Sequence, residues 1–301
     1  MESIRIGIAG TGKIIPESVK ALQETGYEVV SIWGRHPEKA QPLAERFRIP
    51  RVCASYVELL ASGIDFVYIG LVNTVHFDFA RQALEAGLNV ILEKPFCSSA
   101  MQARTLAEMA RSKGLYLFEN ISSLYLPAWQ ALRDQLPDIG TVRLFQADFS
   151  QYSSRYDDYL QGRIAPAFDP ACEGGALRDL NVYNLHLAVS LFGTPGEALY
   201  RANRGPNGID TSGVALLVYP GCLAVCSAAK DSGKPSGVTI QGEKGCHHME
   251  GTPNGGSDRL RHPFAAFRDM YLQNNRSAML AALDHTLAVM EVLDRLTAAD
   301  Q

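Results

Sequence analysis

Two patterns of hydrophobic and polar positions alternate along the first 120 residues of the chain. Short apolar runs, typical of buried strands, occur at residues 4–9, 28–33, 66–69, 90–92 and 115–118. Between them lie stretches with helical spacing, at 16–25, 37–46, 57–62, 77–86 and 100–112. Several of these stretches end in a glycine, where a left-handed cap is expected, as at Gly26, Gly63, Gly87 and Gly114. Alternating strands and helices predict an α/β domain with a doubly wound parallel sheet.

After residue 120 the pattern changes to consecutive strands joined by tight turns. A helix is predicted at 126–136, and strands at 141–149, 197–201, 214–219, 223–229 and 238–241. Strands in direct succession predict an α+β domain with a mostly antiparallel, open sheet. A last helix is expected at 275–298. The chain of 301 residues is long enough for two cores, so we predict a dinucleotide-binding domain at 1–120 and a substrate-binding and oligomerisation domain at 121–301.

Composition and charge narrow the class of protein. Hydrophobic residues make up 47% and charged residues 20%, as in soluble globular proteins. The net charge of -4, without a Lys/Arg block, argues against a nucleic-acid partner. No apolar run reaches the roughly 20 residues that span a bilayer, and the N-terminus enters a strand instead of a signal sequence. We therefore expect a cytoplasmic protein with a small-molecule partner and no membrane partner.

The cysteines do not suggest a metal site. Six are scattered along a chain without a secretory signal, so reduced thiols are expected. Cys222 and Cys226 would lie on one pleat face of a strand. Cys246, His247 and His248 are expected in a glycine-bounded turn. Because these spacings match no zinc motif, we predict no metal.

The first predicted strand breaks into a glycine turn and then a helix, with candidate cofactor contacts at Gly10, Thr11, Gly12, Lys13 and Ile14. Gly10 allows the tight turn, and Gly12 lets the backbone approach a pyrophosphate at the helix N-terminus. The usual third small residue is Ile15 here. An ordinary turn between a strand and a helix has the same pattern, so this motif alone does not establish a dinucleotide-binding site.

The residues after the second predicted strand bear on cofactor preference. Gly34-Arg35-His36 contains no acid for the ribose 2′-hydroxyl of NAD. Arg35 could instead pair with a 2′-phosphate, with Lys39 one helical turn further on as a second cation. This favours NADP over NAD. The alternative is a solvated arginine at a strand end.

Polar residues also follow the next predicted strands: Asn73 and His76 after one, and Glu93-Lys94-Pro95 after another. With the glycine turn, this spacing resembles the Gfo/Idh/MocA family, which contains glucose-fructose oxidoreductase, inositol dehydrogenase and dihydrodiol dehydrogenase. The resemblance implies that Asn73, His76 and Glu93 lie at the cofactor. It also implies that Lys94 lies between the nicotinamide and the substrate hydroxyl, where a cation stabilises developing charge. The alternative is a surface lysine at a strand end.

A second stretch begins with Gly174-Gly175 and continues as an apolar helix to Phe192. Asp179, Tyr183 and His186 are spaced to share one face of this helix. A polar stripe on a buried helix needs hydrogen-bond partners, and both a substrate cleft and a self-satisfied core network provide them.

The pattern Gly-Gly-x-Leu-x-Asp-x-x-x-Tyr resembles the second signature of the same family. The resemblance implies that Tyr183 donates or accepts the proton, that Lys94 lowers its effective pKa, and that Asp179 positions the substrate or Tyr183. His186 is either a proton relay or a core histidine. Asn181 and Asn184 depart from the pattern of many relatives, which leaves the substrate class open.

The resemblance implies an NAD(P)-dependent dehydrogenase or reductase that transfers a hydride to or from a CH–OH carbon of a sugar, a polyol or a related molecule. It also implies a homodimer or homotetramer formed through the C-terminal sheet, with the last helix packing back on the first domain. The polar, aromatic loop at 151–159 is either a substrate lid or a subunit contact, and the stretch at 207–212 has no assigned role. An NAD-dependent glycosidase of the same family and a non-enzymatic nucleotide sensor are the alternative functions.

Overall fold

The computed structural model describes residues 3–233 and 235–299. The chain divides into two compact units, one formed by residues 1–120 and 260–284, the other by residues 121–259 and 285–301. Helix α10 (Arg276–Ala299) contributes residues 276–284 to the first unit and the rest to the second. Within the described residues, no helix has the length and apolar character needed to cross a bilayer.

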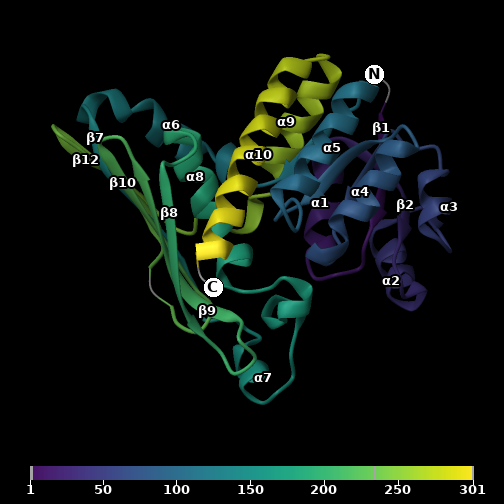
Figure 1. Cartoon of the computed structure of the whole chain (residues 1–301). Coiled ribbons are helices and arrows are strands. Elements are labelled where there is room, and N and C mark those ends of the chain that lie inside the picture. Colours follow the sequence, from purple (N-terminus) through teal and green to yellow (C-terminus); the bar gives the residue numbers. More distant parts are fainter. Residues whose placement is uncertain (1–2, 234, 300–301) are drawn as a thin grey trace. The chain divides into compact units, whose positions relative to one another are not determined.

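The first unit is built on a parallel sheet, drawn in purple and blue in Figure 1. Its strands are β1 (Ile4–Ala9), β2 (Tyr27–Trp33), β3 (Arg51–Val52), β4 (Phe66–Ile69), β5 (Asn89–Glu93) and β6 (Leu117–Asn120). They lie in the order β3-β2-β1-β4-β5-β6, and every pairing is parallel. The predicted doubly wound sheet is confirmed. The two-residue β3 was missed because it is too short for a hydrophobic pattern.

The helices of the first unit are α1 (Ile15–Glu24), α2 (Pro37–Phe47), α3 (Tyr56–Leu60), α4 (His76–Glu85), α5 (Ala100–Lys113) and α9 (Arg261–Leu272). The four glycines expected to end helices all have positive φ, from 72° to 87°. Helix α9 was not predicted. Its Phe264 and Phe267 are almost completely buried, and the Phe267 ring stacks on Phe118 with 4.3 Å between centroids. Residues from late in the chain therefore complete this core.

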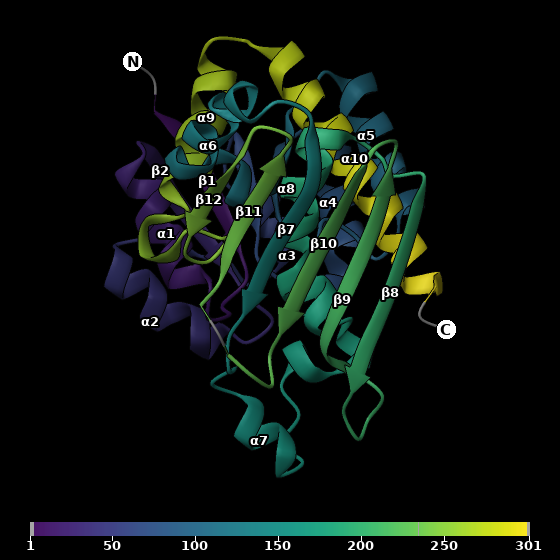
Figure 2. The same cartoon turned by 90° about the vertical axis from the view of Figure 1, so that its left-hand side faces the viewer.

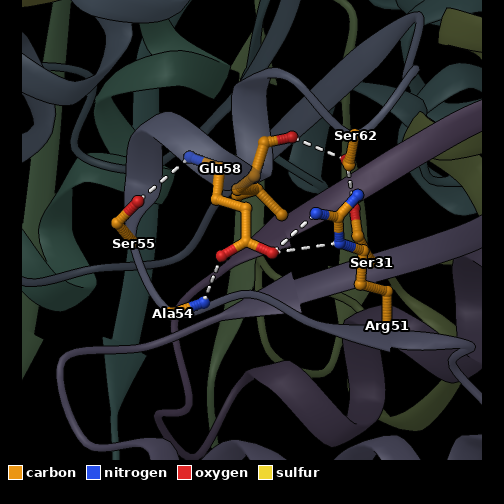
Figure 3. A network of polar contacts seen from close by, with 7 residues as sticks. Ser31, Arg51, Ala54, Ser55, Glu58 and Ser62 are labelled. Atoms are coloured by element: carbon orange, nitrogen blue, oxygen red, sulfur yellow. Dashed lines mark hydrogen bonds and ion pairs between the residues drawn. The ribbon is translucent and has the colours of Figure 1, made fainter.

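A polar network secures the short elements β3 and α3 (Figure 3). Ser55 caps α3 by accepting a hydrogen bond from the Glu58 N–H (3.1 Å), and Glu58 reaches back to the Ala54 N–H (2.9 Å). Arg51 of β3 donates to the same carboxylate at 2.6 Å. The Ala54 N–H and the Arg51 guanidinium together hold the pKa of Glu58 below its usual value. The network is a variant of the capping box, extended to the neighbouring strand.

The second unit contains the other sheet, with strands β7 (Val142–Ser150), β8 (Glu197–Arg204), β9 (Asp210–Tyr219), β10 (Cys222–Ala229), β11 (Gly237–Gly242) and β12 (Gly245–Glu250). The order is β12-β11-β7-β10-β9-β8, and only β7 and β10 pair in parallel. The predicted, mostly antiparallel sheet is confirmed. Strand β12 corrects one expectation: Cys246, His247 and His248 lie in this strand, because the hairpin turn falls one step earlier, between Gly242 and Gly245.

Besides the later residues of α10, the helices of the second unit are α6 (Pro127–Asp134), α7 (Tyr156–Leu160), a π-helix, η6 (Leu177–Asn181), and α8 (Val182–Phe192). Short 3₁₀ turns occur in the first unit at Asn73–Val75, and in the second unit at Ser123–Tyr125, Leu136–Ile139, Pro166–Phe168, Pro170–Cys172 and Gly256–Asp258. One face of the sheet is buried under α8, and Cys222 and Cys226 share it as predicted. Figure 2 shows the opposite face, over which no helix of the described residues lies.

Candidate functional site

The glycine turn after β1 contains two glycines with different surroundings. The Gly10 N–H donates to Trp33 O (2.8 Å), and at φ 133° an added Cβ would lie 2.3 Å from Gly70 O, so the fold itself requires glycine there. At Gly12 an added Cβ would meet nothing within 4 Å among the described residues. Among the described residues, the packing around Gly12 therefore does not by itself require a glycine.

Ile15, which replaces the usual small residue, fits because of a glycine on the neighbouring strand end. It begins α1 and is fully buried. Its Cδ1 would lie 2.7 Å from a Cβ at Gly70, so the missing side chain at Gly70 leaves room for it. The N-cap residue of α1, Ile14, makes no side-chain hydrogen bond to the first amides of this helix.

At the end of β2 lie the cations predicted to select the nucleotide. Gly34 packs directly against the glycine turn, since a Cβ at position 34 would lie 2.5 Å from Thr11 Cγ2. Arg35 and Lys39 are both exposed. His36, between them, lies with its Nδ1 3.3 Å from Glu38 Oε1.

His76 joins the segments that follow β4 and β5. It is completely buried, with Nδ1 3.0 Å from Pro95 O and Nε2 3.2 Å from Leu71 O. Burial lowers its pKa. Asn73, three residues earlier, begins a partly exposed 3₁₀ turn. The ring of His76 therefore holds the backbone on both sides of the predicted cofactor region.

Glu93 is part of a buried network under Lys94. Its Oε1 accepts hydrogen bonds from Tyr68 OH and Asn120 Nδ2, both at 2.6 Å, and Tyr68 OH lies 2.7 Å from Ser18 Oγ. Burial, together with the Glu93 charge, raises the pKa of Tyr68 well above its usual value, so this hydroxyl stays a donor. Lys94 itself is only partly buried. Glu93 and His76 thus fix the backbone that carries Lys94 at the carboxyl end of β5.

In the second unit, the glycine pair of the second signature permits two close backbone contacts. A Cβ on Gly174 would lie 2.7 Å from Pro166 O, and a Cβ on Gly175 would lie 1.8 Å from Asp210 Oδ1. Asp210 accepts hydrogen bonds from the Leu177 N–H (2.7 Å) and from Tyr200 OH (2.8 Å). It therefore caps the helix that carries the candidate catalytic residues. Burial raises the pKa of Asp210.

Asp179 lies in the π-helix η6, a rare form that often occurs at functional sites. Its Oδ2 lies 2.8 Å from the Nζ of Lys230, the residue that follows β10. Lys230 also donates to Ala167 O (2.5 Å), and its ammonium lies 4.5 Å from the centre of the Phe168 ring. This ion pair was not predicted from the sequence. A lysine directly after a strand of small and apolar residues is the pattern in the sequence that could have indicated it.

The three polar residues on the predicted face contact different partners. Tyr183 is 7% exposed and packs edge-on against Phe149. His186 is fully buried, and its Nδ1 lies 3.1 Å from His285 Nε2. Burial and the neighbouring His186 lower the pKa of His285 to about 3.

The two asparagines that depart from the family pattern join this helix to the sheet. Asn181 Nδ2 donates to Cys226 O (2.9 Å), and Asn184 Nδ2 donates to Ser227 O (2.9 Å) and to Asn181 Oδ1 (2.8 Å). Both side chains are fully buried. Their hydrogen bonds to the backbone of β10 therefore explain why asparagines occupy these two positions.

The loop at 151–159 is fixed within its own unit by an aromatic cluster. Tyr159 and Phe168 stack with 4.9 Å between centroids, and Tyr159 OH donates to Asn207 Oδ1 (2.7 Å). Asn207 and Asp210 give the unassigned stretch at 207–212 a role, since one holds this loop and the other caps η6.

Residues 3–233 and 235–299 contain no group of three or more His, Cys, Asp or Glu side chains arranged to hold a metal ion. A parallel sheet in the order β3-β2-β1-β4-β5-β6, with a glycine turn at the end of β1, gives the first unit the architecture of a dinucleotide-binding Rossmann unit. Residues 4–121 match the model of the oxidoreductase family with an NAD-binding Rossmann fold, and residues 130–247 match the C-terminal domain model of the same Gfo/Idh/MocA family. The chain belongs to this family, and it is an NAD(P)-dependent oxidoreductase.

Named relatives agree with this assignment. The chain is 32% identical over 244 residues to scyllo-inositol 2-dehydrogenase (NADP(+)) IolU of Bacillus subtilis, covering 80% of this chain and 74% of the relative. It is 30% identical over 248 residues to trans-1,2-dihydrobenzene-1,2-diol dehydrogenase of Xenopus tropicalis, covering 79% and 73%. The crystal structure of GenD2 from gentamicin A biosynthesis, in complex with NAD, shares the fold with a TM-score of 0.86 at 21% identity, covering 99% of this chain and 94% of that one.

Proposed function

We propose that the protein uses NADP in preference to NAD and acts on a small molecule with neighbouring hydroxyl groups, such as a sugar, a polyol or a dihydrodiol. The names of two relatives, an inositol dehydrogenase and a dihydrodiol dehydrogenase, support this substrate class. The observation that carries the proposal is the second signature, with Asp179 and Tyr183 on one continuous helical segment. The bound nucleotide supplies the hydride-accepting or hydride-donating nicotinamide.

We propose that NADP is held at the glycine turn and at the end of β2. Gly10, Thr11, Gly12, Lys13 and Ile14 would hold the pyrophosphate, and the open space at Gly12 supports this role. For the 2′-phosphate we propose the guanidinium of Arg35, with Gly34 beneath it and Lys39 as a second cation. Both cations are exposed and therefore accessible to a phosphate, which supports this assignment. In addition, the planar guanidinium of an arginine suits a phosphate group. Asn73, His76 and Glu93 would then complete the cofactor region, the last two by fixing its backbone.

We further propose roles for the candidate catalytic residues. Tyr183 donates or accepts the proton at the reacting oxygen, and Lys94 stabilises the charge that develops there. Asp179 accepts a hydrogen bond from the substrate. For His186 we propose a core role, which its complete burial and its contact with His285 support.

We also propose that the protein is a homo-oligomer. Leu199, Val214 and Leu223 are 45%, 46% and 44% exposed. They alternate along their strands with buried residues, so they lie on the sheet face opposite Cys222 and Cys226, which is the face that Figure 2 presents. In the strand register Leu199 is opposite Leu216, and Leu223 is opposite Val218, so the apolar side chains form one surface. A continuous apolar surface of this kind favours burial against a second copy. A cytoplasmic location, and the absence of nucleic-acid and membrane partners, are proposed from the sequence alone.

Calorimetric titration with NADPH and NADH tests the cofactor assignment. The wild type should bind NADPH more tightly, and Arg35→Asp should weaken NADPH roughly tenfold or more while changing NADH much less. Arg46→Asp, an exposed arginine near the far end of α2, is the matched control. Gly12→Ala should weaken both nucleotides without loss of stability, because its Cβ meets no atom of the described residues within 4 Å. Equal effects of Arg35→Asp on both nucleotides would contradict the 2′-phosphate contact.

A further inference from the structure

We infer that Lys230 positions Asp179 for the substrate by binding its carboxylate from the buried side. The inference rests on the proposed function, because it concerns how Asp179 would select a hydroxyl next to the reacting one. It would make Lys230 a determinant of specificity for diols over simple alcohols.

The two side chains differ sharply in exposure. The side chain of Lys230 is 3% exposed, whereas that of Asp179 is 33% exposed. The 2.8 Å contact between Nζ and Oδ2 therefore joins a buried cation to a carboxylate that also reaches the surface of its unit. The ion pair with Lys230 holds this carboxylate in one orientation, which suits it to accept a hydrogen bond from a hydroxyl.

Lys230 is held firmly enough to serve as an anchor. Its N–H donates to Thr211 O (2.8 Å), and its own carbonyl accepts from the Ser153 N–H (2.9 Å). Its ammonium also binds Ala167 O and lies over the Phe168 ring. The backbone and the ammonium are thus both fixed, so the direction of the ion pair is determined by the fold and not by a flexible side chain.

The π-helical turn adds to this arrangement. Among the described residues, η6 is the only helical element of π type, and Asp179 lies at its centre. Asp210 holds its first turn through the Leu177 N–H. Two residues from outside the helix, the buried Lys230 and the partly buried Asp210, therefore act on the same turn, one on the side chain of Asp179 and one on the backbone before it.

The test compares kcat/KM for cyclohexane-1,2-diol and for cyclohexanol with NADP+, in the wild type, Asp179→Asn and Lys230→Met. A positioning role predicts that the preference for the diol falls roughly tenfold or more in both variants. The double variant should show the same preference as Asp179→Asn, because both changes remove one interaction. NADPH affinity, measured by calorimetry, should stay within twofold of the wild type.

Two further variants separate positioning from stability. Lys230→Gln keeps a donor for Ala167 O but lacks the charge for Asp179, so it provides the same test if Lys230→Met does not fold. Lys244→Met, which removes an exposed lysine of the same unit, should leave the preference unchanged.

The outcomes are distinct. If Lys230→Met or Lys230→Gln lowers kcat/KM for both alcohols equally, the preference is unchanged and the positioning role is overturned. If the wild type binds NADPH but oxidises neither alcohol nor scyllo-inositol, the proposed function fails, and the role of Lys230 in it fails too. If the wild type oxidises scyllo-inositol but neither cyclohexane probe, the variants are compared with scyllo-inositol as the substrate. The inference then requires a KM at least tenfold higher in the Lys230 variants than in the wild type. An unchanged KM overturns it.

Discussion

Gly175 provides the sharpest test of how the second signature shapes the site. Its φ is +100°, and a Cβ there would lie 1.8 Å from Asp210 Oδ1. Gly175→Ala must therefore move the Asp210 carboxylate away from the Leu177 N–H and from Tyr200 OH. Gly208 offers a matched control in the same unit, since its φ is +82° and an added Cβ meets no described atom within 4 Å.

The expected magnitudes follow from these contacts. Both alanines have a left-handed backbone, which costs roughly 1–2 kcal/mol. Gly175→Ala also breaks two hydrogen bonds to a carboxylate, each worth about 1.5–3 kcal/mol. After partial relaxation, we expect Gly175→Ala to reduce the free energy of unfolding by about 3 kcal/mol more than Gly208→Ala.

Equilibrium urea unfolding of both variants measures this difference, and hydrogen exchange at the Leu177 amide should speed up only in Gly175→Ala. The Asp210→Ala change removes the atom that Gly175→Ala would strike. The double variant should therefore lose less stability than the sum of the two single variants. Equal losses in Gly175→Ala and Gly208→Ala, or strict additivity in the double variant, would refute the proposed role of Asp210.

Three further predictions concern other parts of the protein. The pKa of His285 is about 3 in the folded chain and about 6.5 when unfolded, so the unfolded state gains its proton first as pH falls. The free energy of unfolding should therefore decline below pH 6.5 by up to about 1.4 kcal/mol per pH unit. In urea titrations, His285→Gln should make this decline less steep. An unchanged slope in His285→Gln would contradict the lowered pKa of His285. Tyr183→Phe should lower turnover roughly a hundredfold with NADPH binding intact, whereas Tyr219→Phe, at the same 7% exposure, should not; equal turnover in both would remove Tyr183 from proton transfer. Leu223→Lys should reduce the mass measured by light scattering, whereas Leu160→Lys, 58% exposed on α7, should leave it unchanged; an unaltered mass for Leu223→Lys would contradict the proposed interface.

The fold could be predicted well where the hydrophobic pattern is long and regular. Strands β1 and β4 have the predicted bounds, because each is a buried run closed by glycine or by a polar turn. Helix α9 was missed because its buried phenylalanines lie among charged and polar residues. Strand β12 was taken for a turn because its Gly245 stands at the strand start.

The candidate site was less accessible to prediction, because its supporting contacts join residues far apart in sequence. Lys230 lies 51 positions from Asp179, and Asp210 lies 33 positions from Leu177. Local spacing contains no information about such pairs. The single-face arrangement of Asp179, Tyr183 and His186 was a prediction from an ideal α-helix, and the π-helical turn at the start of this segment alters that geometry.

The late position of α9 has a consequence for how the chain folds during synthesis. Phe264 and Phe267 complete the core around Tyr68 and Phe118, yet they follow the entire strand sequence of the second unit. While a ribosome is still making residues 121–259, the nascent Rossmann sheet lacks these aromatic side chains, and the matching surface is open to water or to a chaperone. The nucleotide unit can therefore reach its final stability only after residues 260–284 have been synthesised.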